Sequence, residues 1–311
     1  MRNCKMNYRS IFLVPALFLI AACGEEQAAT DPAPAPSHDT PYAVGSSTFF
    51  IHDDTRPYDS VNGIDEGIRT LITEIWYPVD HDVAGSGQYQ RATYGDYVFG
   101  DREAHQLMMT KTTFFHMTPD TVREGVSGEQ IDDAITELFL RERASYVDAP
   151  LADTGTTLPV IVMSHGDAGS RYNMETVVEY LAAHGYLVIA PEHTGNSPYS
   201  LTGRDPALDT DRDFREKMAG VLAQLSELGA YGDEDHYGQS YTPLSAGRGS
   251  IEFLQQLDKS LLQRLNDLRA ALRQLDRMNA EGFAGTGPGA LDLERIGLTG
   301  RSFGGATTLV G

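Results

Sequence analysis

The spacing of apolar residues changes along the chain and separates an early β-rich part from a later part with alternating elements. Residues 47–51 and 71–77 have the composition of strands, and the second run alternates apolar and polar positions up to Pro78, where we expect the strand to stop. Residues 128–143 place apolar side chains three and four positions apart, which predicts a helix. The aromatic, turn-rich residues 89–100 predict no regular element.

Strands and helices alternate from residue 158 onwards. Residues 160–163 form a continuous apolar run, as in parallel strands that are buried on both faces. A predicted helix ends at Gly185, and residues 186–190 form the next strand, which stops at Pro191. The apolar residues of that helix are Val177, Val178, Tyr180 and Leu181. This alternation predicts an α/β fold with a mainly parallel sheet flanked by helices.

Residues 195–250 interrupt the alternation and are interpreted as an insertion with a helical stretch near 214–228. Asp233, Asp235 and His236 at its tip are residue types that ligate metals, but a solvated polar loop is the favoured interpretation. Leucines recur at helical spacing over residues 251–278, and we expect this helix to pack on the sheet instead of forming a coiled coil. Its Asp and Arg residues are expected on a solvated outer face.

A G-x-S-x-G pattern occupies residues 300–304, between a short apolar run at 295–299 and a stretch of small and apolar residues at 305–310. The pattern alone is weak, but a strand before it and a helix after it favour the nucleophile elbow of α/β-hydrolases over a glycine-rich turn. In that turn a strained backbone exposes a serine, and a Cβ on either glycine would clash with the neighbouring strand and helix. Ser302 is therefore the predicted nucleophile.

The N-terminus has the features of an export signal. Basic residues precede an apolar run at residues 11–21, which is too short to span a bilayer comfortably and ends in small residues. Residues 19–23 resemble the lipobox of bacterial lipoproteins, which implies that Cys23 is lipidated; an ordinary secretory signal is the alternative. The predicted organisation is a signal peptide (1–22), a flexible tether (23–40) and a hydrolase domain (41–311). The resemblance to bacterial lipoproteins also implies anchoring to the outer membrane or cell surface, because Gly24, not Asp, follows the cysteine.

Charge and cysteine content narrow the possible functions. The net charge is −20, and removal of Arg2, Lys5 and Arg9 with the signal peptide leaves 21 basic residues against 44 acidic ones. Nucleic-acid binding is excluded on this basis, because phosphate contacts need clustered Lys and Arg. Cys4 would leave with the signal peptide and Cys23 would be acylated, so disulfides, thiol nucleophiles and zinc–thiolate sites are excluded. We expect no cofactor, and the oligomeric state stays open.

Three blocks resemble the platelet-activating-factor-acetylhydrolase-like and dienelactone-hydrolase-like branch of α/β-hydrolases. They are Trp76-Tyr77-Pro78, residues 158–197 with Ser164-His165-Gly166, His184-Gly185-Tyr186 and Pro191-Glu192-His193, and residues 295–307. The chain departs from the branch at Arg301, where histidine is usual. The resemblance implies that Ser302 is the nucleophile and that the backbone N–H groups of Phe303 and Asp167 form the oxyanion hole. It also implies that His165 and Gly166 support the oxyanion loop and that His165 is structural, not the base.

These observations together predict a lipid-anchored serine hydrolase that acts on a small-molecule or lipid ester through an acyl-enzyme. In this fold the catalytic acid and histidine follow the serine, but no Asp, Glu or His occurs after Gly304. We therefore expect the chain to be the N-terminal part of a longer hydrolase, without its C-terminal strands. The alternative is a non-catalytic lipoprotein module that binds or scaffolds with a hydrolase-like half-fold.

Overall fold

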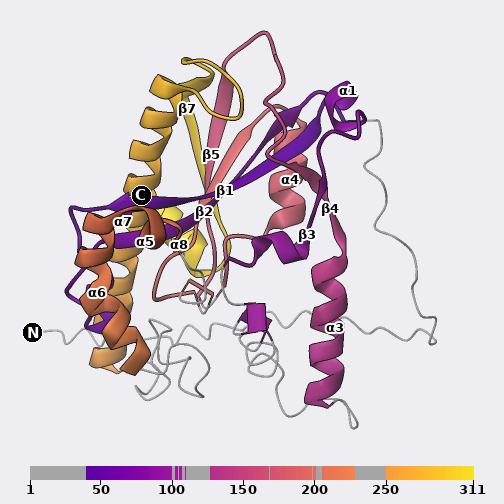
Figure 1. The fold of residues 1–311 in the computed structure, drawn as a ribbon. Helices are drawn as coiled ribbons and strands as arrows, with labels where there is room; N and C mark the ends of the chain where they lie inside the picture. Colours follow the sequence, from indigo (N-terminus) through magenta and orange to yellow (C-terminus); the bar gives the residue numbers. More distant parts are fainter. Residues whose placement is uncertain are drawn as a thin grey trace, which may run out of the picture. The chain divides into compact units, whose positions relative to one another are not determined.

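A seven-stranded sheet organises the part of the chain that the computed structural model describes (Figure 1). The described residues are 40–99, 102, 103, 105, 106, 109, 127–167, 169–197, 199, 200, 205–227 and 250–311. The strand order is β3-β4-β1-β2-β6-β5-β7. The predicted signal peptide, the tether, Cys23 and the acidic tip at 230–238 lie outside the described residues.

The strands are β1 (Ala43–Asp53), β2 (Arg69–Val79), β3 (Arg91–Thr93), β4 (Glu142–Val147), β5 (Leu158–Ser164), β6 (Leu187–Pro191) and β7 (Leu291–Gly300). The helices are α1 (His81–Ala84), α3 (Gly128–Leu140), α4 (Glu175–Ala183), α5 (Ala207–Thr210), α6 (Arg212–Glu227), α7 (Ile251–Glu281) and α8 (Phe303–Val310). Short 3₁₀ turns are η1 (Ser60–Asn62) and η2 (Tyr94–Tyr97).

The sheet is mixed, whereas the sequence predicted a mainly parallel one. β5 pairs in parallel with β6 and β7, and β1 pairs in parallel with β4. The β1–β2, β2–β6 and β3–β4 pairings are antiparallel. The difference arises because β1 and β2 are joined directly by residues 54–68, without the crossover helix that a parallel connection needs.

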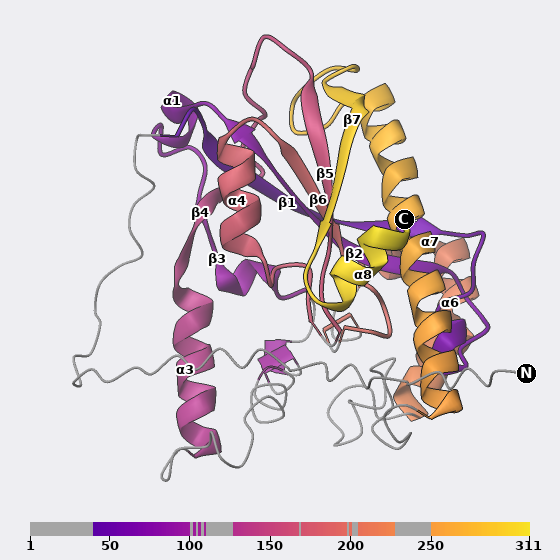
Figure 2. The same cartoon turned by 180° about the vertical axis from the view of Figure 1, so that it is seen from behind.

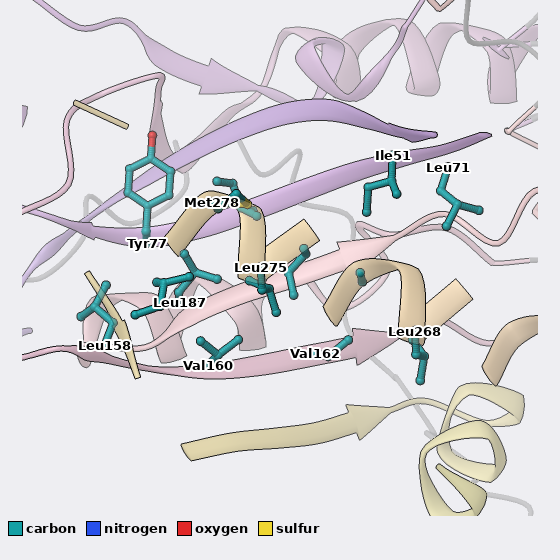
Figure 3. Close-up of a cluster of buried hydrophobic side chains, with 14 of the residues drawn as sticks. Ile51, Leu71, Tyr77, Leu158, Val160, Val162, Leu187, Leu268, Leu275 and Met278 are labelled. Atoms are coloured by element: carbon teal, nitrogen blue, oxygen red, sulfur yellow. The ribbon is translucent and has the colours of Figure 1, made fainter. Parts of the chain in front are cut away.

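Helices cover both faces of the sheet, as Figure 2 shows from behind. Val160 and Val162 of β5 pack with Leu268 and Leu275 of α7 on one face (Figure 3). Met163 of β5 packs on the opposite face with apolar residues of α4. The side chains of β5 are thus buried on both sides, in agreement with its continuous apolar sequence.

Two early boundaries differ from the predicted ones. β2 continues through Pro78 to Val79. Its pairing with β6 ends at Trp76, and the Pro78 carbonyl accepts from the Ala152 N–H at 2.9 Å on the side away from β1. The missing N–H of Pro78 therefore removes no bond from the β1–β2 ladder. α3 ends at Leu140, before the predicted end at 143, because β4 begins at Glu142.

The inward faces of two helices also differ from expectation. In α4, Val177 and Tyr180 are exposed, whereas Glu175 and Glu179 are buried. α7 packs on the sheet as predicted, but Arg264 and Asp267 are fully buried and do not form part of a solvated outer face. Both helices therefore carry charged residues into the interior, where other elements supply their partners.

The helices of the predicted insertion pack on the connection between β1 and β2. Phe214, Met218 and Val221 of α6 form a buried cluster with Tyr58 and Ile68. The backbone N–H of Ile68 also points to the sulfur of Met218 at 3.4 Å. This segment therefore adds a second, smaller core beside the sheet.

Candidate active site

Ser302 lies in the turn between β7 and α8, in the strained backbone conformation expected of a nucleophile elbow. Its φ is 53° and its ψ is −118°, and its side chain is exposed. A non-glycine residue in such a conformation costs on the order of 1–3 kcal/mol and persists only where the surrounding structure enforces it. This geometry presents the hydroxyl group at the tip of the turn.

Two glycines allow the close approach of segments that builds this turn. A Cβ on Gly300 would come within 3.0 Å of the backbone of Gly304, and a Cβ on Gly304 would come within 3.0 Å of the carbonyl groups of Ser164 and His165. Because these neighbours are backbone atoms, they cannot move aside as a flexible side chain can. The steric roles predicted for both glycines are confirmed.

The predicted oxyanion loop lies directly beside the elbow. The Arg301 N–H donates to the Ser164 carbonyl at 3.2 Å, and a Cβ on Gly166 would lie 3.5 Å from Cβ of Ser302. Phe303 is the first residue of α8, where helix geometry gives the N–H no intrahelical acceptor. Asp167 follows Gly166 in the loop. The fold therefore places both segments next to Ser302, while the donor roles of Phe303 and Asp167 stay predictions.

His165 is buried, and both of its ring nitrogens form hydrogen bonds within the loop region. Its Nε2 accepts from the His193 N–H at 2.9 Å, so Nδ1 carries the proton that is donated to the Gly166 carbonyl at 2.7 Å. Burial, assisted by His193 and Arg264, holds the pKa of His165 well below its usual value. The neutral ring has no nitrogen available to take a proton from Ser302, which is consistent with the structural role predicted for it.

The structure also contains a serine–histidine–aspartate arrangement that the sequence did not reveal. Nε2 of His193 lies 2.9 Å from Oγ of Ser164, and its Nδ1 lies 3.0 Å from Oδ2 of Asp267. Arg69 binds Asp267 with two hydrogen bonds, of 3.0 and 2.7 Å. These connections have the order of a catalytic triad.

Burial argues against a nucleophilic role for this second serine. Ser164, His193 and Asp267 all have 0% exposed surface, so an ester carbonyl cannot reach Ser164 in this structure. Burial lowers the pKa of His193 to about 3, with Arg264 as a second cause, so the ring is neutral and donates from Nδ1 to Asp267. The arrangement therefore connects the end of β5 to the segment after β6 and to α7.

Among the described residues, no imidazole or carboxylate forms a hydrogen bond with the hydroxyl group of Ser302; the histidine and aspartate described above serve Ser164 instead. The described residues likewise hold no cluster of three His, Cys, Asp or Glu side chains suited to a metal ion. None of the described helices combines the length and apolar character needed to cross a membrane.

A comparison with protein-family models agrees with this architecture. A family model described as platelet-activating factor acetylhydrolase, isoform II, matches residues 128–230. The chain has the α/β-hydrolase fold. The match covers the predicted oxyanion loop and extends across α6, into the segment interpreted as an insertion, but it stops before the turn that holds Ser302.

Two further comparisons complete these findings. No curated protein matches the chain. Among solved structures, the chain is similar to a ferulic acid esterase from Streptomyces cinnamoneus, with 22% identity and a TM-score of 0.41 over 89% of this chain. The chain spans 56% of the length of that esterase structure.

Proposed function

We propose that the protein is a carboxylic-ester hydrolase that uses Ser302 as its nucleophile. The observation that carries the proposal is the strained, exposed backbone position of Ser302 between β7 and α8, with the Gly166 loop beside it. The acetylhydrolase family model over residues 128–230 supports ester cleavage independently of the elbow.

The reaction follows from these positions. Oγ of Ser302 attacks the ester carbonyl carbon, and its proton passes to a general base. The N–H groups of Phe303 and Asp167 stabilise the tetrahedral oxyanion. The C–O bond to the alcohol then breaks, the alcohol leaves with the proton, and water hydrolyses the acyl-enzyme to release the acid and restore Ser302.

The proposed substrates are small-molecule or lipid esters with a short acyl group. The family model is named for an acetylhydrolase of platelet-activating factor, and hydrolysis of an acetyl group supports a substrate with a short acyl group. Attachment of the protein to a membrane through lipidated Cys23 would bring such an enzyme close to lipid esters. Cys23→Ser is expected to move the full-length protein from the membrane fraction to the soluble fraction, and unchanged fractionation would contradict anchoring.

The test compares the two candidate serines in the full-length protein. The wild type, Ser302→Ala and Ser164→Ala are assayed with p-nitrophenyl acetate and labelled with a fluorophosphonate, and the labelled residue is mapped by mass spectrometry. We expect the label on Ser302, no turnover by Ser302→Ala, and continued labelling of Ser302 in Ser164→Ala. Label on Ser164, or equal turnover by the wild type and Ser302→Ala, would overturn the assignment. A folded wild type with neither turnover nor label would favour the binding or scaffold module.

A further inference from the structure

Arg264, on α7, contacts the predicted oxyanion loop, the segment after β6 and the start of α8, although it is itself completely buried. Its guanidinium donates to the carbonyl of His165 and to the side-chain oxygen of Asn196, and it lies 3.2 Å from Oγ of Ser164. Its Cζ also lies 4.8 Å from the centre of the Phe303 ring. These partners come from the end of β5 and the loop after it, the segment after β6, and the first turn of α8.

The contacts of Arg264 reach both predicted oxyanion donors. Phe303 is contacted directly, through its ring. Asp167 is reached through Asn196, whose Nδ2 donates to the Asp167 carboxylate at 2.5 Å while its Oδ1 accepts from Arg264. One side chain therefore connects the two backbone segments whose N–H groups must converge on the same oxygen atom.

The middle of α7, which carries Arg264, is itself fixed. Asp267, one turn further along the helix, is bound by Arg69 from β2 and by Arg56, whose Nη2 lies 2.9 Å from Oδ1 of Asp267. Asp267 also accepts from His193. Arg264 is thus held on a helix that is anchored to β2 and to the segment after β6, which suits a group that must position others.

We propose that Arg264 is a positioning residue for the oxyanion hole, which fixes the Asp167 and Phe303 segments relative to each other and to Ser302. The planar guanidinium has several N–H donors in a rigid arrangement, so it can bind the His165 carbonyl and Asn196 at once, whereas a lysine ammonium on a flexible stem cannot reproduce this arrangement. Its buried positive charge also stabilises the negative charge that develops on the neighbouring oxyanion in the transition state. This inference rests on the proposed function.

The experiment compares Arg264→Gln and Arg264→Lys with Arg143→Gln in the full-length protein. Arg143 is a matched control because it is also a buried arginine stacked on an aromatic ring, 3.8 Å above Tyr97, but it lies on β4 and contacts Ser46. Measurements are kcat and KM for p-nitrophenyl acetate, inhibition by an alkyl boronic acid that mimics the tetrahedral intermediate, and the thermal midpoint.

We expect Arg264→Gln to lower kcat about 10- to 100-fold with KM changed less than threefold, because the lost alignment matters only when the oxyanion forms. Boronic acid inhibition should weaken in proportion to kcat/KM. Arg264→Lys should fall between Arg264→Gln and the wild type, since it keeps the charge without the planar donors. Arg143→Gln should lower the thermal midpoint while kcat stays within threefold of the wild type.

A result in which Arg264→Gln loses thermal stability but keeps kcat and boronic acid inhibition within threefold would overturn the proposal and leave Arg264 a packing residue. If Arg264→Gln does not fold, Arg264→Lys and Asn196→Ala decide the question, and kcat within twofold of the wild type in both would overturn it. Fluorophosphonate labelling separates this failure from that of the proposed function. If the wild type is labelled at Ser302 and the variants keep the wild-type kcat, only the role of Arg264 is refuted. An unlabelled wild type refutes both the role of Arg264 and the proposed function.

Discussion

Ser302 combines an exposed side chain with a backbone conformation that L-residues avoid. Three non-glycine residues in the described part of the chain have positive φ, and Ser302 has a ψ of −118°, far from the left-handed helical region. The neighbouring contacts at Gly300 and Gly304 hold the turn in place. The strain is therefore maintained by packing and should be measurable as a stability difference.

Ser302→Gly is expected to be more stable than Ser302→Ala. Both variants remove the hydroxyl group, but only glycine adopts this φ and ψ without a Cβ clash, which recovers on the order of 1–3 kcal/mol of strain. The greater freedom of glycine in the unfolded chain offsets about 0.5–1 kcal/mol of this gain. Urea unfolding should give a net advantage for glycine of about 1 kcal/mol. Equal stability, or a more stable alanine variant, would show that the turn is not strained.

Glu179 is a second residue whose environment has a measurable consequence. Its carboxyl group accepts from the backbone N–H of Ser145 at 3.0 Å and faces Glu175 on α4 and Arg143 on β4. Burial, followed by the charge of Glu175, raises the pKa of Glu179 to about 7 against the opposing effect of Arg143. The folded protein therefore keeps this proton at pH values where the unfolded chain has lost it.

Glu179→Gln should become more stable relative to the wild type as the pH rises. The folded-state pKa exceeds the unfolded value of 4.5, so this group's contribution is fully present below pH 4.5 and is lost as the pH rises through about 7. Glutamine keeps an acceptor for Ser145 and does not ionise. The difference in unfolding free energy should shift in favour of the variant by about 2–3 kcal/mol between pH 5 and pH 8. Glu137→Gln, on the exposed side of α3, provides the control, and parallel pH profiles for Glu179→Gln and the wild type would refute the prediction.

At the scale of the element, the contact between α8 and β5 depends on one of two adjacent glycines. Gly304 faces the carbonyl groups at the end of β5, whereas a Cβ on Gly305 would lie 3.4 Å from its nearest neighbour, the Gly300 carbonyl. Both residues lie in the first turn of the same helix, so they form a matched pair.

Gly304→Ala should separate α8 from β5, and Gly305→Ala should not. We expect a loss of several kcal/mol and loss of esterase activity for Gly304→Ala, because the clash is with backbone atoms and the oxyanion loop must move. For Gly305→Ala the gain in helix propensity, about 1 kcal/mol, offsets the tighter contact, so its stability should be close to that of the wild type. Chemical denaturation with an ester assay distinguishes the two, and similar losses in both variants would contradict this account.

Apolar periodicity located the elements whose buried faces are apolar and missed those whose buried faces are polar. β5, β6 and α7 were predicted close to their observed bounds. β4 was missed because its buried positions are Arg143 and Ser145, which invert the usual strand pattern. Whether such residues are buried depends on partners far away in the sequence, so no local pattern reveals it.

The candidate site shows the same limit. The motif at 300–304 and the Ser164-His165-Gly166 block predicted which segments meet, and the structure brings them together. The inward positions of Arg264 and Asp267 were not predicted, because leucine spacing identifies α7 as a helix but does not show that Arg69, His165 and His193 supply the partners. The available indication in the sequence was that Arg264 and Asp267, an oppositely charged pair three residues apart, lie on the same helix face as the leucines.

At the scale of the whole molecule, two arrangements of α6 can be distinguished. It either unfolds together with the sheet as one unit or forms a separate covering element. Val221 of α6 is fully buried against residues of the β1–β2 connection, including Ile68. A Cβ on Gly67 would also come within 3.0 Å of Val221. Close packing between segments about 150 residues apart in the sequence favours one cooperative unit.

Val221→Ala should therefore lower the stability of the whole protein and leave a single unfolding transition. Removal of two buried methyl groups costs on the order of 1.5–2.5 kcal/mol when the site cannot collapse. Val177→Ala is the matched control, because Val177 is also helical but 45% exposed, and the better helix propensity of alanine should leave its stability almost unchanged. Thermal unfolding followed by circular dichroism, together with hydrogen exchange of β1 and β2, tests both variants. If α6 were a separate covering element, Val221→Ala would speed exchange in α6 alone and leave the main transition at the wild-type temperature, because the sheet would keep its stability when α6 detaches.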